Sequence, residues 1–146
     1  MKKIQKFNVS HLNENDFKGG GLRKYSKYRD LGIAKATNGL AHAQVIKMIP
    51  PRTDEVSVWH QHDVEFQLIY VLEGWIMSEF DGLGPIVMRK GSCWIQPPNI
   101  NHIVHDYSDD CEMLEIILPA DFKTIETNAG AAQKYLKPSK KVRKKK

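Results

Sequence analysis

Short apolar runs separated by turn-forming residues dominate the chain from about position 40 to position 118. The clearest run, residues 66–72 (FQLIYVL), is rich in aromatic and β-branched residues and ends at Glu73-Gly74, a plausible tight turn. Similar runs predict strands at 40–49, 56–62, 65–72, 75–80, 86–89, 92–96, 101–105 and 111–118. Many short strands with Gly, Pro, Asn and Asp between them are typical of an all-β sandwich or barrel.

The two ends of the chain follow this pattern less closely. Residues 1–24 are polar and end in a Gly-Gly-Gly run, which indicates an N-terminal arm. Residues 25–36 fit either an extended arm or a short strand packed on the barrel, and residues 119–135 could hold a short helix. We therefore expect one β domain at 25–125, with a C-terminal extension at 126–146 that is helical or disordered.

The formal net charge of +5 comes from the end of the chain. Residues 137–146 (KPSKKVRKKK) carry seven of the 22 Lys and Arg residues and no acidic residue, which leaves 15 basic against 17 acidic residues elsewhere. Such a run is expected to be a solvated, disordered tail, although it could attract nucleic acid or an anionic membrane. No nucleic-acid-binding motif accompanies it, so we expect no specific nucleic-acid partner.

Neither a membrane span nor a secretory signal is visible in the sequence. No apolar run approaches the length needed to cross a bilayer, and the basic N-terminus lacks an apolar core. Cys93 and Cys111 are the only cysteines and form no Cys-x-x-Cys motif, which suits a reducing compartment. These features predict a cytoplasmic protein with no membrane partner.

Two histidines one residue apart, His60 and His62, lie in a predicted strand. Side chains at i and i+2 of a strand point to the same face, so both imidazoles could reach one metal ion. The pair alone is weak evidence, because such pairs also occur as surface or core histidines.

A second stretch, residues 91–102 (GSCWIQPPNINH), adds a third histidine. Its strand must end at Pro97-Pro98, because proline has no backbone N–H to donate to a sheet. Asn99 suits the turn that follows, since it tolerates a left-handed backbone. His102 then begins the next strand and is free to face the first pair.

These two stretches together resemble the two sequence motifs of the cupins. The spacing of His-x-His, Glu and Gly in the first motif, and of Gly, Pro-x-Gly and His in the second, matches at His60, His62, Gln67, Gly74, Gly91, Pro97, Asn99 and His102. Two residue types depart from the motifs: Gln67 stands where the family usually has Glu, and Asn99 where it usually has Gly. Phrases at 28–34, 66–75 and 106–122 also resemble small stand-alone cupins, including zinc members that cyclise aromatic polyketides.

The resemblance implies an all-β cupin jelly roll (a double-stranded β-helix barrel) that holds one divalent metal ion on His60, His62 and His102. Zinc and iron(II) are the leading candidates, with nickel, manganese and cobalt as alternatives. Gln67 could be a further ligand or could only form a hydrogen bond nearby. A neutral amide ligand would leave the charge of the ion uncompensated, which strengthens it as a Lewis acid but weakens its binding.

Glu65 is the first candidate for a general base, because it shares strand parity with Gln67 and could face inward. The alternative is a solvent-exposed carboxylate at the start of the strand. His105 lies three residues past His102 and would therefore point out of the site unless a bulge intervenes.

Three function classes remain open for a cupin of this kind. It could be a metal-dependent enzyme that acts on a small organic molecule, as an isomerase, cyclase, lyase or oxygenase. It could be a non-catalytic module that binds a metal or small molecule, or a structural cupin whose site has decayed. Three intact histidines argue against decay, and a metal-dependent enzyme is the leading hypothesis. Within that class, a neutral fourth ligand favours redox-neutral chemistry over oxygen chemistry. The resemblance to small cupins also implies a homodimer.

Overall fold

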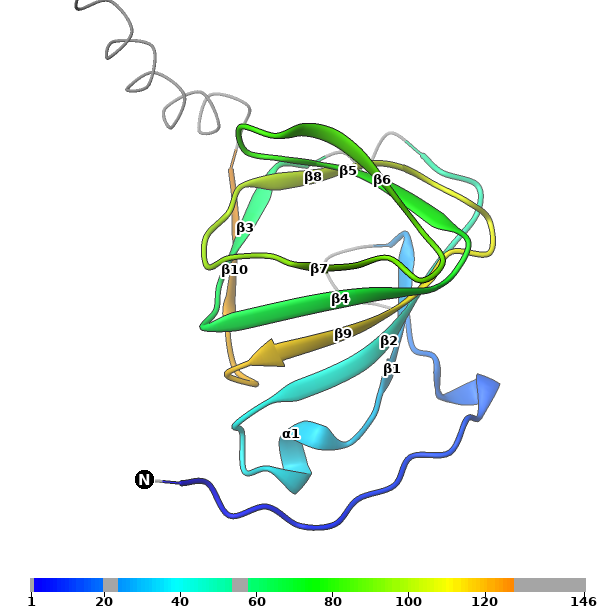
Figure 1. Cartoon of the computed structure of the whole chain (residues 1–146). Coiled ribbons are helices and arrows are strands. Elements are labelled where there is room, and N and C mark those ends of the chain that lie inside the picture. The colour runs from blue at the N-terminus through cyan, green and yellow to red at the C-terminus, as the bar shows by residue number, and fades with distance from the viewer. Residues whose placement is uncertain (1, 20–23, 54–57, 128–146) are drawn as a thin grey trace, which may run out of the picture.

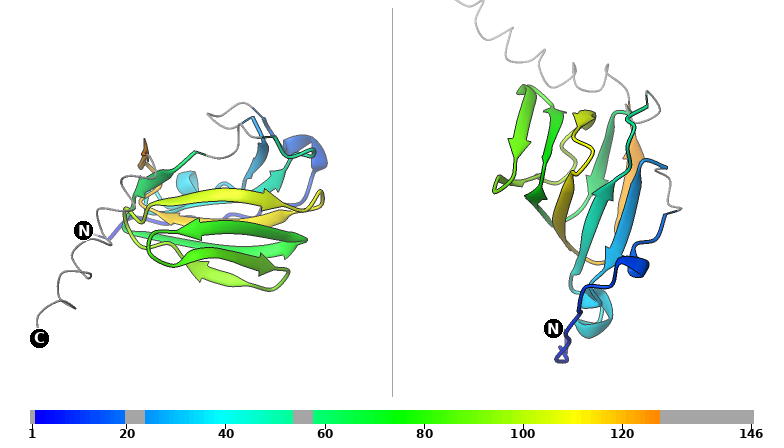
Figure 2. Two further views of the ribbon diagram at one scale, coloured as in Figure 1. Left: turned by 90° about the horizontal axis from the view of Figure 1, so that it is seen from above. Right: turned by 90° about the vertical axis from the view of Figure 1, so that its right-hand side faces the viewer.

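Two five-stranded antiparallel sheets face each other and form the body of the protein (Figures 1 and 2). The computed structural model describes residues 2–19, 24–53 and 58–127. Its strands are β1 (Ser26–Asp30), β2 (His42–Met48), β3 (His60–Asp63), β4 (Phe66–Glu73), β5 (Trp75–Phe80), β6 (Gly84–Arg89), β7 (Cys93–Ile95), β8 (His102–Tyr107), β9 (Glu112–Leu118) and β10 (Lys123–Glu126). One sheet has the order β1-β2-β9-β4-β7 and the other the order β10-β3-β8-β5-β6. This arrangement confirms the predicted all-β jelly roll.

Helix is scarce in the described part of the chain. It comprises a 3₁₀ turn, η1 (Glu14–Asp16), and a single turn of α-helix, α1 (Ile33–Ala36). No helix of the described residues is long and apolar enough to span a membrane.

Each of the eight predicted strands overlaps one of the strands β2 to β9, although residues 56 and 57 lie outside the described residues. The ambiguous stretch 25–36 forms β1 followed by α1. The helix considered for residues 119–135 is wrong for their described part, which instead contains β10 paired antiparallel with β3. The rest of the C-terminal extension, with its basic tail, lies outside the described residues.

The side chains of β4 alternate between the interior and the surface. Gln67, Ile69 and Val71 are at most 3% exposed, whereas Tyr70 between them is 40% exposed. This is the period-2 pattern of a strand with one face on the core. Much of the shared interior between the sheets is a hydrophobic cluster, and its buried members include Ile46, Met48, Ile76, Phe80, Met88, Val104 and Met113.

Two turns place the motif residues. Gly74 joins β4 to β5 with φ +67°, and a Cβ there would collide with the Ser108 and Asp110 side chains, so only glycine fits. Asn99 has φ +61° in the turn between β7 and β8, which explains how it can stand where cupins usually have Gly. The turn at Asn99 brings His102 to the start of β8, beside β3.

The N-terminal arm runs along the outside of the molecule past α1 and β1 (Figures 1 and 2). The Lys6 N–H donates to Ala36 O at 2.7 Å, and Asn8 Nδ2 donates to Leu31 O at 2.9 Å. Lys18, farther along the arm, pairs with Tyr28 of β1 through two backbone hydrogen bonds, one in each direction. The arm is therefore fastened through its backbone and polar groups.

Candidate metal centre

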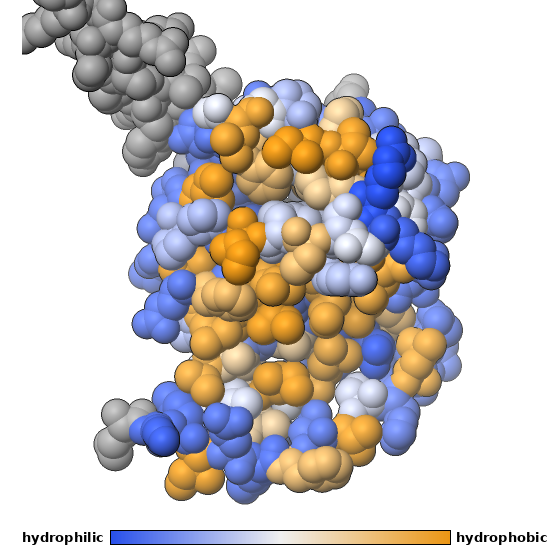
Figure 3. Space-filling view, in the orientation of Figure 1, coloured by the Kyte–Doolittle hydropathy of each residue, from blue (hydrophilic) through white to orange (hydrophobic). Residues whose placement is uncertain are grey.

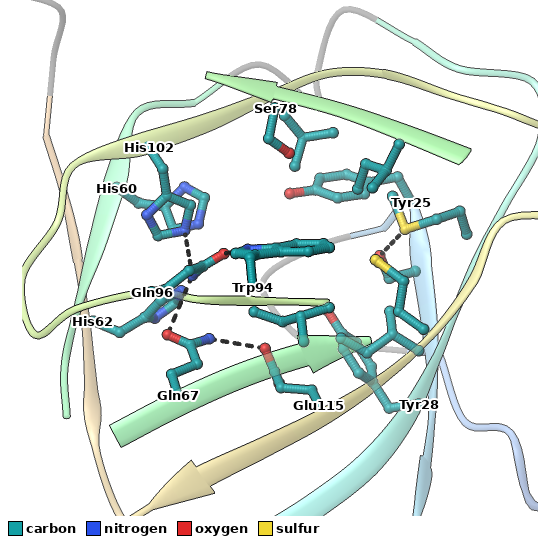
Figure 4. A pocket seen from close by; sticks show the side chains of 17 residues that line it. Tyr25, Tyr28, His60, His62, Gln67, Ser78, Trp94, Gln96, His102 and Glu115 are labelled. Carbon is teal, nitrogen blue, oxygen red and sulfur yellow. Dashed lines mark hydrogen bonds between the residues drawn. The ribbon is translucent and has the colours of Figure 1, made fainter. Parts of the chain in front are cut away.

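Three histidines from two neighbouring strands converge inside the barrel (Figure 4). His60 and His62 lie on β3, and His102 begins β8 directly opposite His60. One ligand atom from each ring lies within 4.8 Å of the others. His60 and His102 are buried, at 3% and 4% exposed, and His62 is half-buried. The predicted convergence of these three side chains is confirmed.

The Nδ1 atom of each of the three histidine rings already has a hydrogen-bond partner. His60 Nδ1 lies 2.8 Å from Val58 O, and His102 Nδ1 lies 2.9 Å from Ile100 O. A carbonyl oxygen can only accept, so each Nδ1 carries the proton and each Nε2 of the neutral ring keeps its lone pair. His62 Nδ1 lies 2.9 Å from Thr124 Oγ1 on β10. Holding Nδ1 by a hydrogen bond is how proteins orient metal-ligating histidines.

Gln67 is 2% exposed and lines the same pocket as the histidines. Its Nε2 donates to Glu115 Oε2 at 2.9 Å, and its Oε1 accepts from Gln96 Nε2 at 3.2 Å. Gln96 Nε2 also lies 3.4 Å from His102 Nε2, which joins the amides to the histidine cluster. The amide oxygen of Gln67 is therefore linked to the cluster through Gln96, and its role as a metal ligand stays a prediction.

The pocket is a cavity of about 70 Å³ between the two sheets. The histidines form one end, while Tyr25 and Tyr28 lie on the side away from them and Trp94 lies between (Figure 4). The remaining apolar lining comes from Ile46, Met48, Ile69, Ile76, Val104 and Met113. On the face of the molecule that Figures 1 and 3 turn toward the viewer, hydrophobic side chains gather across the middle (Figure 3). The site thus has a polar, nitrogen-rich end and an apolar, aromatic end.

Glu65 does not reach this pocket. It lies in a bend just before β4, is exposed, and is not among the lining residues. The expectation that it faces inward with Gln67 is wrong, because strand alternation does not extend past the first residue of β4, Phe66. His105 points away from the pocket as expected, and its Nε2 lies 2.7 Å from Glu79 Oε2.

Sequence reasoning missed several residues of the site, chiefly Gln96, Glu115, Tyr25 and Tyr28. A usable signal existed for Glu115, because it is a lone carboxylate within the apolar strand run MLEIIL. Its alternation with buried Met113 and Ile117 indicates an inward side chain. The tyrosines had no such signal, since their part of the chain has no clear period.

Comparisons with known proteins agree with this geometry. Residues 46–117, which include all three histidines, match the Cupin domain family model. A search of curated protein sequences finds no match.

Solved structures match over most of the chain at low identity. The polyketide cyclase RemF from Streptomyces resistomycificus is 18% identical, with a TM-score of 0.63 over 82% of this chain and 86% of that chain. A sugar phosphate isomerase of the cupin superfamily from Silicibacter pomeroyi is 17% identical, with a TM-score of 0.61 over 82% of each chain. FeII HppE is 13% identical, with a TM-score of 0.57 over 75% of this chain and 59% of that chain. Such identities show a shared fold and leave the reaction open. The matching family model, both sequence motifs and the ten-stranded jelly roll together show that the chain belongs to the cupin superfamily.

Proposed function

We propose that the protein binds one divalent metal ion on His60, His62 and His102, and that it is a metal-dependent enzyme acting on a small organic molecule. The observation that carries this proposal is the convergence of three imidazoles whose Nδ1 atoms are held from behind. Three protein ligands leave positions open for water or substrate, as catalytic sites require. Gln67 is the candidate fourth ligand through its amide oxygen, and zinc and iron(II) are the leading metals.

The residues of the cavity define what a substrate could be. The bound ion would act as a Lewis acid toward an oxygen atom of the substrate. Trp94, Tyr25 and Tyr28 offer aromatic surface for an apolar or conjugated body at the other end of the cavity. We therefore propose a small molecule with a carbonyl, enol or carboxylate oxygen at one end and an apolar portion at the other. A redox-neutral isomerisation, cyclisation or elimination is favoured over an oxygenase reaction.

A non-catalytic binding module is the alternative, and one observation favours it. Among the described residues that line the cavity, Glu115 is the only carboxylate, and both of its oxygens already accept hydrogen bonds from glutamines. A carboxylate held in this way is poorly placed to abstract a proton from a substrate. With Glu65 outside the pocket, an enzyme would need a base from another lining side chain such as Tyr25 or Tyr28, from bound water or from the substrate.

The test is turnover measured against metal content. Protein purified without an affinity tag is stripped with a chelator and reloaded with zinc or iron(II). It is then incubated in air and under nitrogen with β-dicarbonyl compounds, 2-oxo acids and hydroxylated aromatics, and the products are followed by NMR. Conversion that needs the metal, is lost in His62→Ala and persists in His105→Ala would support the enzyme. Saturable binding of a compound without conversion would support the binding module. If the metal-loaded protein neither converts nor binds any of these compounds, the result would contradict both hypotheses.

A further inference from the structure

Glu115 lies one hydrogen bond behind Gln67, on the strand next to β4. We infer that Glu115 is a positioning residue, which orients the amide oxygen of Gln67 toward the histidines and supplies the negative charge that cupins usually carry at position 67. This inference rests on the proposed metal site. It assigns to a residue outside both sequence motifs the part that the motif glutamate would otherwise play.

Both oxygens of the Glu115 carboxylate are used. Gln67 Nε2 donates to Oε2 at 2.9 Å, and Gln44 Nε2 donates to Oε1 at 2.8 Å. The register explains this placement, because Gln44 on β2 pairs directly with Glu115, and Gln67 is two residues from Ile69, the partner of Glu115 on β4. The carboxylate is therefore held between two amide groups from the strands on either side.

The direction of the hydrogen bonds is fixed at both ends of this network (Figure 4). The indole of Trp94 can only donate, and its Nε1 lies 3.0 Å from Gln96, so the amide atom of Gln96 facing it must be Oε1. Gln96 then presents Nε2 to Gln67, whose facing atom must be Oε1. At the other end the ionised carboxylate of Glu115 can only accept, so Gln67 must turn its Nε2 toward it.

The consequence concerns the atom that Gln67 offers to a metal. An amide oxygen can ligate a cation, whereas an amide nitrogen cannot, so the orientation of Gln67 decides whether it is a possible ligand. Glu115 holds the nitrogen toward β9 and leaves Oε1 facing Gln96, whose Nε2 also lies 3.4 Å from His102 Nε2. Its charge also lies in a cavity with few other charges, where Coulomb interactions with a cation are stronger than in water.

The first test is Glu115→Gln, which removes the charge and leaves nearly the same shape. Two amide groups, Gln44 and Gln67, then compete to donate to one amide oxygen, so one must turn or lose its partner. We expect the dissociation constant for zinc or cobalt(II), measured by competition with a fluorescent chelator, to rise about 10- to 100-fold. The matched control is Glu112→Gln, which makes the same charge change on β9 but does not line the pocket, and should stay within about twofold of wild type.

The second test exchanges the two residues. In the double variant Gln67→Glu/Glu115→Gln, every hydrogen bond can be remade. Gln44 donates to the new amide at 115, which donates to the new carboxylate at 67, and that carboxylate also accepts from Gln96. We expect this variant to bind the metal at least as tightly as wild type and to recover its cobalt(II) absorption spectrum. Gln67→Glu alone should melt at a lower temperature, because it sets two carboxylates against each other.

These outcomes separate this inference from the proposed function. If wild type binds no metal, the proposed metal site fails, and the melting temperatures of the metal-free proteins still test the network. Without metal, Glu115→Gln should melt about 3 °C or more below wild type, and the double variant should regain the wild-type melting temperature. The inference is overturned if Glu115→Gln binds metal within twofold of wild type, or if the exchange rescues neither affinity nor stability.

Discussion

His60 on β3 is paired directly with His102 on β8, and their ring centroids lie 4.1 Å apart. This is the pairing that connects the two strands in the second sheet. The two sequence motifs of the family are thus joined at the pair of residues proposed to share a metal ion. The register of these strands sets the positions of the histidines. Substitutions that disturb β3, β8 or β10, the other neighbour of β3, should therefore weaken metal binding at the proposed site.

Thr124 on β10 gives the most selective test of this idea. Its hydroxyl lies 2.9 Å from His62 Nδ1 and outside the group of proposed ligands. Thr124→Val keeps the shape but removes the hydroxyl, so His62 loses the group that orients its ring. We expect divalent-metal affinity to fall about 10-fold, with little change in melting temperature. Thr124→Ser keeps the hydroxyl and should bind like wild type, and equal losses in both variants would argue against this role.

Gly74 should be far less replaceable than other glycines with positive φ. Gly74→Ala combines a left-handed backbone with a collision against Ser108 and Asp110, whereas Gly84→Ala has φ +75° and no atom within 4 Å of the new Cβ. The Gly84 variant should lose about 1 kcal/mol of the free energy of unfolding from backbone strain alone. The Gly74 variant should lose at least about 2 kcal/mol more. Urea denaturation of the two variants measures both, and similar losses would contradict the close packing described at this turn.

Cys111 is fully buried, and burial raises its pKa from 9.0 to about 12. Native protein at pH 8 should therefore show one reactive thiol, the exposed Cys93, and a second only after unfolding. Between pH 9 and 12 the unfolded chain releases the Cys111 proton while the folded chain keeps it. The unfolded state then binds fewer protons, so stability falls as pH rises through this window, by up to about 1.4 kcal/mol per pH unit from this group.

Urea midpoints measured between pH 8 and 11 test the sign. Wild type should lose more stability over this range than Cys111→Ala, in which the group is absent. A parallel fall in both proteins, or two reactive thiols in the native state, would contradict the burial of Cys111.

The homodimer remains a prediction, and the N-terminal arm indicates where to test it. Phe7 is 95% exposed and Leu12 is 63% exposed, although the arm itself is held by hydrogen bonds to the body. If a second copy covers these side chains, Phe7→Ser/Leu12→Ser should shift the mass measured by light scattering from dimer toward monomer. Leu83, in the turn between β5 and β6, is 67% exposed, and Leu83→Ser is the control that should leave the mass unchanged. A monomeric wild type would refute the prediction.

How far the sequence predicts this structure depends on where alternation is clean. The strands from β2 to β9 follow from period-2 patterns and turn residues, and the three histidines follow from motif spacing. β10 was missed because it is a four-residue strand at the edge of its sheet whose residues are all exposed, so no buried face marks it. Glu65 was misplaced because the bend before β4 breaks the parity on which the prediction depended.

The network behind Gln67 could not be predicted in the same way. It depends on which strands are neighbours, β2 and β4 on either side of β9, and strand order between distant segments leaves no local pattern. Gln44, Gln67 and Glu115 are far apart in the chain and meet only through that order. Such contacts carry the specific features of this cupin, whereas the motifs carry what it shares with the family.

The most direct test of the metal site is the metal content of protein purified without an affinity tag, measured by inductively coupled plasma mass spectrometry. We predict close to one zinc or iron ion per wild-type chain, retained in His105→Ala and lost in His102→Ala. His105 is the matched control because it lies on the same strand but bonds to Glu79 outside the pocket. Wild-type protein that carries no ion, and binds none after dialysis against zinc, iron(II), nickel, manganese and cobalt, would contradict the proposed metal site.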